Sequence, residues 1–150
     1  GKRPGEEIAT SYGTQTLWPP HCVEHSLGAD LVAPLQIISY KKIFHKGTKS
    51  SVDSYSVFFD AKGIASTDIE KELKKSGIKE LYFAGVASDY CVKYSILDAI
   101  SLGFVCYCIQ DACKFSSKDS HIQERCYREL IEKGCHYIFS DQIKWYLIGF

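Results

Sequence analysis

The stretch that decides the fold is Ile78-Lys-Glu-Leu-Tyr-Phe-Ala-Gly-Val-Ala-Ser-Asp-Tyr-Cys-Val92. Residues 78–84 have the composition of a buried strand. From residue 89 the apolar side chains recur at helical spacing up to residue 102, and Gly103 ends that predicted helix. A buried strand followed at once by an amphipathic helix is typical of a sheet covered by helices.

The same alternation extends on both sides of this stretch. Further strands are predicted at residues 104–109 and 135–139, helices at 67–75 and 122–131, and a short closing helix at 141–147. Strand, helix, strand, helix, strand in this order requires right-handed parallel crossovers. The sequence therefore predicts an α/β fold with a parallel sheet.

Composition excludes several classes of function. The chain has 150 residues, 45% of them hydrophobic, which suits a single domain. Its 18 basic and 18 acidic residues give zero net charge, so we expect no nucleic-acid partner and no membrane partner. Of the seven cysteines most lie in apolar runs and none forms a Cys-x-x-Cys pair, which indicates a reduced, cytoplasmic protein.

Cys91 lies between the predicted strand 78–84 and the helix that follows it. Chemistry gathers at the carboxyl ends of parallel strands. In the first turn of a helix, free N–H groups and the helix dipole favour a thiolate, and the same N–H groups can hold an oxyanion. Periodicity alone nevertheless favours the alternative, a buried structural cysteine.

Three segments of the chain are informative together: Leu17-Trp-Pro-Pro-His-Cys-Val23, Lys46-Gly47 followed by Tyr55-Ser56, and Gly85-Val-Ala-Ser-Asp-Tyr-Cys-Val92. In this order they resemble nicotinamidases of the isochorismatase-like superfamily. They are similar to the family's metal-site loop, its catalytic-lysine segment and its nucleophile motif, respectively. The resemblance implies a three-layer α/β/α fold with a mostly parallel sheet, formed by residues 1–150 as a single domain.

The resemblance implies roles for residues around the nucleophile. Cys91 would attack the carboxamide of nicotinamide and form a thioester, releasing ammonia. Lys46 would stabilise the thiolate, although a solvated lysine is the ordinary alternative. The peptide between Val86 and Ala87 is expected to be cis, so that the N–H groups of Ala87 and Cys91 form the oxyanion hole.

The resemblance also implies a metal and a binding site for an aromatic ring. His21 matches the family's metal-ligand histidine, and its structural alternative is a histidine without a ligand role. Zn²⁺ suits such a site best, with Fe²⁺ or Mn²⁺ as alternatives, and the metal would hold the ring nitrogen of the substrate. Trp18, Tyr55 and Ala87 are expected to contact the substrate, while core packing is the alternative for the two aromatic residues.

Part of the family's machinery is missing from the sequence. The family pattern places a catalytic aspartate and an Asp-x-His metal pair upstream of the Trp-Pro-Pro-His segment. Residues 1–16 are polar, are predicted to form a loop, and contain no aspartate. The sequence therefore predicts a domain that lacks its N-terminal strands, with that segment part of the same fold; alone, the chain is expected to be inactive and to bind metal weakly.

Three functions remain open at this point. The first is nicotinamide hydrolysis in NAD salvage, with pyrazinamide-like amides as further substrates. The second is another isochorismatase-like amidase, and the third is a non-catalytic homologue that binds a small aromatic ligand or a partner. The sequence does not decide between a monomer and a homo-oligomer.

Overall fold

A three-stranded parallel sheet forms the centre of the fold. The computed structural model describes residues 1–36 and 42–143. In sheet order, the strands are β3 (Glu80–Val86), β4 (Val105–Lys114) and β5 (His136–Ile138). Both neighbouring pairs are parallel, so the predicted α/β class and parallel sheet are confirmed.

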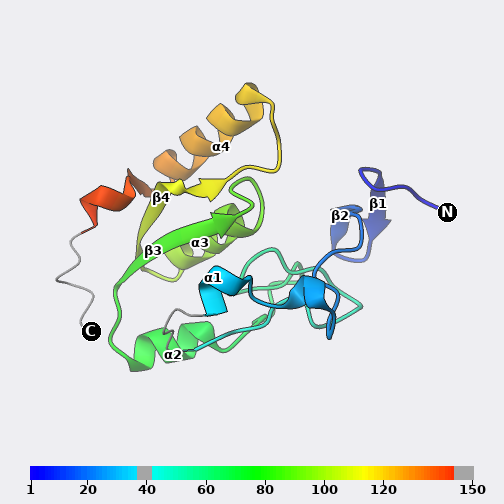
Figure 1. Cartoon of the computed structure of the whole chain (residues 1–150), viewed down its shortest axis with the longest axis horizontal. Helices are drawn as coiled ribbons and strands as arrows, with labels where there is room; N and C mark the ends of the chain where they lie inside the picture. Colours follow the sequence, from blue (N-terminus) through cyan, green and yellow to red (C-terminus); the bar gives the residue numbers. More distant parts are fainter. Residues whose placement is uncertain (37–41, 144–150) are drawn as a thin grey trace.

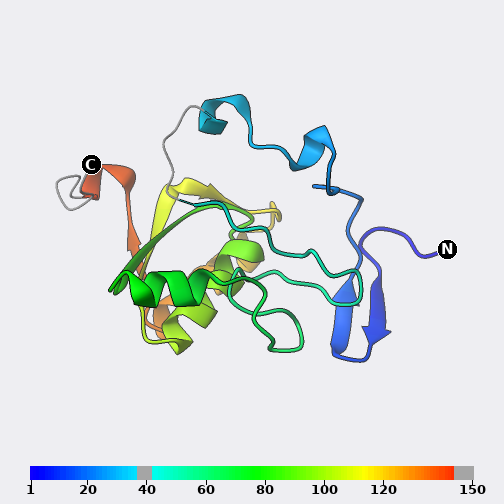
Figure 2. The ribbon, with the colours of Figure 1, turned by 90° about the horizontal axis from the view of Figure 1, so that it is seen from below.

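Three helices cover one side of this sheet. They are α2 (Ile69–Lys75), α3 (Cys91–Ser101) and α4 (Ser120–Glu132), each within two residues of its predicted bounds. Figure 2 shows all three on the same side, with η1 (Leu27–Ala29) and α1 (Ala33–Gln36) on the other. The core between sheet and helices holds Ile96 of α3 and Leu130 of α4, both almost fully buried.

The cysteines pack as small hydrophobic residues. All seven are free thiols, and five of them are buried in the core between β3, β4, α3 and α4: Cys106, Cys108, Cys113, Cys126 and Cys135. These five side chains pack among the apolar residues of the core, as free cysteines usually do.

The N-terminal residues form a hairpin, so the predicted loop over residues 1–16 is wrong. β1 (Glu7–Thr10) pairs antiparallel with β2 (Gly13–Thr16), and Figure 1 shows them apart from the central sheet. In the turn, the Thr10 hydroxyl donates to the Gly13 carbonyl at 2.7 Å, and Gly13 adopts a φ of 124°. These strands bury no apolar face, so no hydrophobic alternation marks them in the sequence.

The predicted closing helix at residues 141–147 is described only over its first residues. Its described part is η2 (Ser140–Gln142), a single 3₁₀ turn, and residues 144–147 lie outside the described residues. The Ser140 N–H and hydroxyl both donate to the Asp111 carboxylate, at 2.9 and 2.6 Å. These two bonds hold the turn against the end of β4.

Within the described ranges, one face of the sheet and the outer edges of β3 and β5 lie open. Tyr82, Tyr107 and His136 stack across the three strands, and Tyr82 is 43% exposed. Within those ranges β3 pairs only with β4, which leaves its second edge free. An unpaired edge offers backbone groups to a further strand.

Candidate active site

Cys91 is the first residue of α3 and lies five residues after Val86, the last residue of β3. The ammonium group of Lys46 donates to the Cys91 sulfur at 3.4 Å and to the carbonyl of Ser54 at 2.8 Å. A cation beside the sulfur and the positive end of a helix both favour a thiolate. The structure thus brings together the two residues that the resemblance assigns to catalysis.

The turn before Cys91 leaves main-chain donors available. The peptide bond between Val86 and Ala87 is cis, as expected. The Ala87 carbonyl accepts the N–H groups of Tyr90, at 3.0 Å, and Val92, at 3.1 Å. Across residues 1–36 and 42–143, the N–H groups of Ala87 and Cys91 themselves donate to no partner. Main-chain N–H groups without a partner can hold an oxyanion.

A groove of about 380 Å³ runs along β3 beside these residues. Lys46 and Cys91 line one part of it, and the rest is apolar: Val57, Phe58, Ile69, Leu73, Leu81, Tyr82, Phe83, Ala84, Val86 and Val92, with Ser95. The groove therefore extends from the Cys91 sulfur along β3, the strand with a free edge.

An aromatic cluster lies next to the turn of residues 87–90, which joins β3 to α3 and is called the nucleophile turn below. The Trp18 indole N–H donates to the Tyr55 hydroxyl at 2.9 Å, and the Trp18 ring meets Tyr90 edge to face at 4.6 Å. Burial raises the pKa of Tyr55, while the hydrogen bond from Trp18 works in the opposite direction. The resemblance did not assign a role to Tyr90; its place next to Cys91 is the signal that could have identified it.

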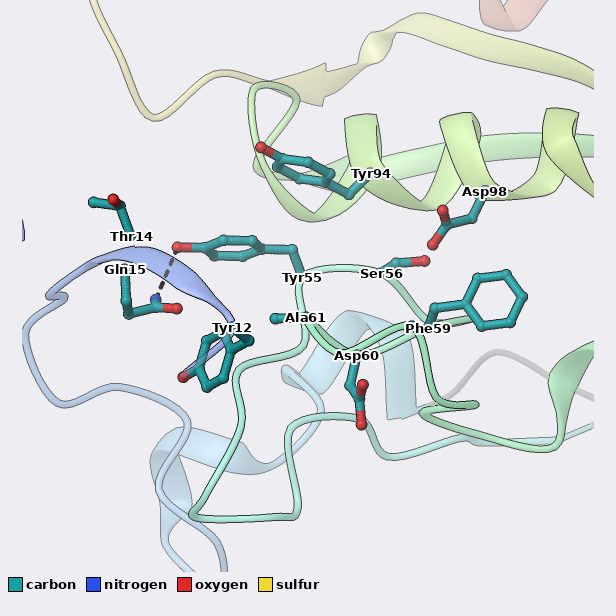
Figure 3. A pocket seen from close by; sticks show the side chains of 11 residues that line it. Tyr12, Thr14, Gln15, Tyr55, Ser56, Phe59, Asp60, Ala61, Tyr94 and Asp98 are labelled. Carbon is teal, nitrogen blue, oxygen red and sulfur yellow. Dashed lines mark hydrogen bonds between the residues drawn. The ribbon is translucent and has the colours of Figure 1, made fainter. Parts of the chain in front are cut away.

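A larger cavity of about 540 Å³ is lined by Tyr55 and by residues of the β1–β2 hairpin and of α3 (Figure 3). Gln15 of β2 donates to the Tyr55 hydroxyl at 3.3 Å, and Tyr55 stacks on Tyr94 at 5.4 Å. Neither Cys91 nor Lys46 lines this cavity. We therefore assign the reactive site to the smaller groove, because its chemistry requires the thiol and the ammonium group.

His21 lies exposed on the loop that follows the hairpin. Its Nδ1 atom is 2.7 Å from the Pro19 carbonyl, which leaves Nε2 available, the arrangement typical of a metal-ligating histidine. Within the described residues, no group of three or more His, Cys, Asp or Glu side chains could share a metal ion. His21 thus fits a metal in donor type, and the other ligands would have to come from elsewhere.

No carboxylate in the described part of the chain forms a hydrogen bond with Cys91 or Lys46. Asp53 accepts from Gln15 and from the Ser54 N–H, and Asp60 accepts from the N–H groups of Lys62 and Ile64. The pair Asp119-Ser-His121 has Asp-x-His spacing, but Asp119 accepts the His121 N–H at 2.8 Å and caps α4. These acids have structural partners of their own.

Comparisons with known proteins match most of the chain. The model of the family described as "Isochorismatase domain" matches residues 9–131. A nicotinamidase of Acinetobacter baylyi is 36% identical over 143 residues, which cover 95% of this chain and 66% of that protein. One of Escherichia coli is 44% identical over 100 residues, 67% of this chain and 47% of that protein. The chain thus spans between about half and two thirds of these relatives.

Solved structures of a nicotinamidase and a pyrazinamidase are also similar to this chain. An Acinetobacter nicotinamidase and pyrazinamidase superposes with a TM-score of 0.88 at 35% identity, covering 94% of this chain and 68% of that one. A pyrazinamidase of Pyrococcus horikoshii, solved in complex with zinc, gives a TM-score of 0.68 at 31% identity, covering 83% and 64%. Separately, no helix in residues 1–36 or 42–143 has the length and apolar character needed to cross a bilayer.

Proposed function

The chain belongs to the isochorismatase family, and from this premise we propose that the complete protein is a nicotinamidase, hydrolysing nicotinamide to nicotinate and ammonia. The observation that carries the proposal is the Lys46 ammonium group 3.4 Å from the Cys91 sulfur at the start of α3. Relatives named nicotinamidase, 36% and 44% identical, support the substrate. A role in NAD salvage and a cytoplasmic location are part of the same proposal.

Cys91 is the proposed nucleophile. Its thiolate attacks the carboxamide carbon, forming a C–S bond and moving the C=O electron pair onto oxygen, where the N–H groups of Ala87 and Cys91 stabilise it. The proton given up by the Cys91 thiol is passed to the amide nitrogen, the C–N bond breaks to release ammonia, and the oxyanion collapses to a thioester. Water then adds to the thioester and gives up a proton, the C–S bond breaks, and nicotinate leaves with the Cys91 thiolate restored.

Lys46 stabilises the thiolate through its charge, and the thiol proton needs a separate acceptor. No described carboxylate bonds to Cys91, so we assign this role to an aspartate on a strand that pairs with the free edge of β3. The groove beside Cys91 supports that assignment. Residues 1–150 would then be part of one isochorismatase-like domain, and without that strand we expect no turnover.

Trp18, Tyr55 and the backbone at Ala87 form the proposed substrate-binding site. Two aromatic side chains joined by a hydrogen bond of 2.9 Å suit the flat ring of nicotinamide. Tyr90 keeps the Trp18 ring in place through its edge-to-face contact. Homo-oligomer formation would not be needed for these contacts, which all come from one chain.

His21 is the proposed metal ligand of this chain. The zinc-bound pyrazinamidase supports a divalent ion, and Zn²⁺ is favoured over Fe²⁺ and Mn²⁺. When bound, such an ion supplies a Lewis acid for the ring nitrogen and so orients the substrate. The remaining ligands are assigned to parts of the protein outside the described residues.

Ammonia release by the complete protein tests this function. Nicotinamide and pyrazinamide should be hydrolysed, whereas benzamide, which has the same carboxamide but no ring nitrogen, should show kcat/KM lower by about tenfold or more. Equal values for benzamide would contradict recognition of the ring nitrogen. Release of ammonia from another amide but from none of these three would indicate a different amidase of the family.

A non-catalytic homologue is the second candidate, favoured by the lack of a proton acceptor beside Cys91 in the described residues. Such a protein would bind nicotinamide or another small aromatic amide without releasing ammonia. Calorimetric binding combined with the ammonia assay separates the two candidates, since only the enzyme gives both signals.

A further inference from the structure

Asp89 lies two residues before Cys91, and its carboxylate accepts three hydrogen bonds from the loop between β4 and α4. The donors are the Ser116 N–H at 2.9 Å, the Ser116 hydroxyl at 2.7 Å and the Ser117 N–H at 3.0 Å. Hydrogen bonds to an ionised carboxylate are shorter and stronger than neutral ones. Asp89 therefore ties the turn between β3 and α3 to the turn between β4 and α4.

The start of α3 has no side-chain cap, although the Cys126 thiol of α4 donates to the Ser88 carbonyl at 3.5 Å and the Tyr90 ring packs on Trp18 and Tyr55. Tyr90, at the N-cap position, makes no capping hydrogen bond with its side chain. The turn has one further tie to this loop, from the Ser88 N–H to the Lys114 carbonyl at 2.8 Å. Both ties reach residues 114–117, so the placement of Cys91 depends on that segment.

Residues 114–117 are themselves anchored to α4. The Ser117 hydroxyl accepts the Asp119 N–H at 3.1 Å, and the Ser117 carbonyl accepts from the Gln123 side chain at 2.7 Å. The Phe115 ring meets Tyr127 of α4 edge to face at 5.1 Å. The contacts thus run from α4 through Ser117 to Asp89 and the nucleophile turn.

We propose that Asp89 is a positioning residue, which holds the turn so that the Cys91 sulfur stays within reach of Lys46 and the two free N–H groups. Asp89 touches none of the reacting atoms and acts only through Ser116 and Ser117. Burial works to raise the pKa of Asp89, but the bonds from Ser116 and Ser117 outweigh it and hold that pKa below its usual value. The acceptor is therefore ionised at neutral pH. This inference rests on the proposed function in taking Cys91 as the nucleophile.

Asp89→Asn in the complete protein tests the inference, because the amide keeps the shape but loses the charge and one acceptor oxygen. Asp111→Asn is the matched control: Asp111 also accepts the N–H and hydroxyl of one serine, Ser140, but holds η2 instead of the nucleophile turn. Two quantities are measured: the rate of Cys91 alkylation by iodoacetamide, followed by peptide mass spectrometry, and the kinetics of nicotinamide hydrolysis.

Asp89→Asn should lower both the alkylation rate and kcat by about tenfold or more, while KM changes by less than about threefold, since small misplacements of a reacting group are costly. Asp111→Asn should leave both within about twofold of the wild type. Ser116→Ala, which removes one of the three bonds, should give an intermediate loss. Asp89→Glu is not expected to keep the wild-type alkylation rate, because its longer side chain cannot place the carboxylate at the same distance from the N–H groups of Ser116 and Ser117.

Wild-type alkylation and kcat in Asp89→Asn, or equal losses in Asp89→Asn and Asp111→Asn, would overturn the inference. If Asp89→Asn does not fold, Ser116→Ala decides, and wild-type values there count against it. If no ammonia is released by any variant while alkylation still separates Asp89→Asn from Asp111→Asn, the proposed function fails and the positioning role stands.

Discussion

At the residue scale, Lys46 and Cys91 are 45 positions apart in the sequence, and their side chains meet at 3.4 Å. Lys46 reaches this place from a segment without regular structure, where its ammonium group is also held by the Ser54 carbonyl. The contact puts a positive charge beside the sulfur and leaves one ammonium N–H without a partner within the described residues. That donor is free to meet a further acceptor at the site.

Replacing Lys46 by methionine removes the charge but keeps a side chain of similar length. We expect kcat for nicotinamide to fall by about a hundredfold, since an electrostatic contact to a reacting group is lost. Lys49→Met is the control, because Lys49 is paired with Asp60 at 3.8 Å and makes no contact with Cys91. A Lys46→Met protein with kcat within about twofold of the wild type would contradict the role of Lys46.

At the element scale, α3 and α4 begin in different ways. Asp119 caps α4 by accepting the His121 N–H at 2.8 Å, whereas α3 has no side-chain cap and depends on Asp89 and the loop after β4. The proposed nucleophile, Cys91, is therefore carried by a helix whose start is held by residues outside that helix. This makes the turn sensitive to the packing of α4.

Asp119→Ala should reduce the free energy of unfolding by about 1 kcal/mol, the usual cost of losing an N-cap. Asp68→Ala serves as the control, because Asp68 holds the N-cap position of α2 without a capping hydrogen bond. Urea denaturation of both variants measures the difference. Equal losses would show that the Asp119 cap contributes nothing specific.

The contribution of the Asp89 hydrogen bonds to the free energy of unfolding should depend on pH in the acid range. Because the folded-state pKa of Asp89 lies below its usual value, its contribution to stability is present above about pH 4 and is lost as pH falls through the lowered value. The difference in unfolding free energy between wild type and Asp89→Asn should therefore be full at pH 6 and shrink below about pH 4. A difference that stays constant down to about pH 2 would contradict the tie.

Local patterns predicted those elements that bury an apolar face. The strand before Cys91 and the helices at 89–102 and 122–131 were predicted within about two residues because their periodicity is local. β4 runs to Lys114, whereas the prediction ended it at Ile109. The prediction stopped there because polar Gln110 and Asp111 interrupt the apolar run. At that place the pairing of β4 with β3 is irregular, with a register shift between Phe83 and Gly85. The ties of Asp89 could not be predicted, because their partners follow a different strand.

At the scale of the whole molecule, the described sheet has helices on one side and a free edge at β3, next to the groove that contains Cys91. His21 lies outside this sheet, on an exposed loop. Under the proposed function, a complete site would need a carboxylate at the groove and further metal ligands beside His21. In residues 1–36 and 42–143, no carboxylate forms a hydrogen bond with Cys91 or Lys46, and no group of three or more possible metal ligands is present.

His21→Ala should lower the zinc content of the complete protein after dialysis against a zinc buffer. The imidazole is the one ligand that the proposal takes from this chain, and losing a ligand costs roughly tenfold or more in metal affinity. His25→Ala is the matched control, since His25 is exposed on the same loop and has no assigned role. Equal zinc content in His21→Ala and wild type, measured by elemental analysis, would remove His21 from the metal site.

Ammonia release from nicotinamide, by the complete protein and by its Cys91→Ala variant, tests the role of Cys91 most directly. If Cys91 is the nucleophile, the variant should lose kcat by about a thousandfold or more, because the thioester can no longer form. Equal rates for the two proteins would contradict it.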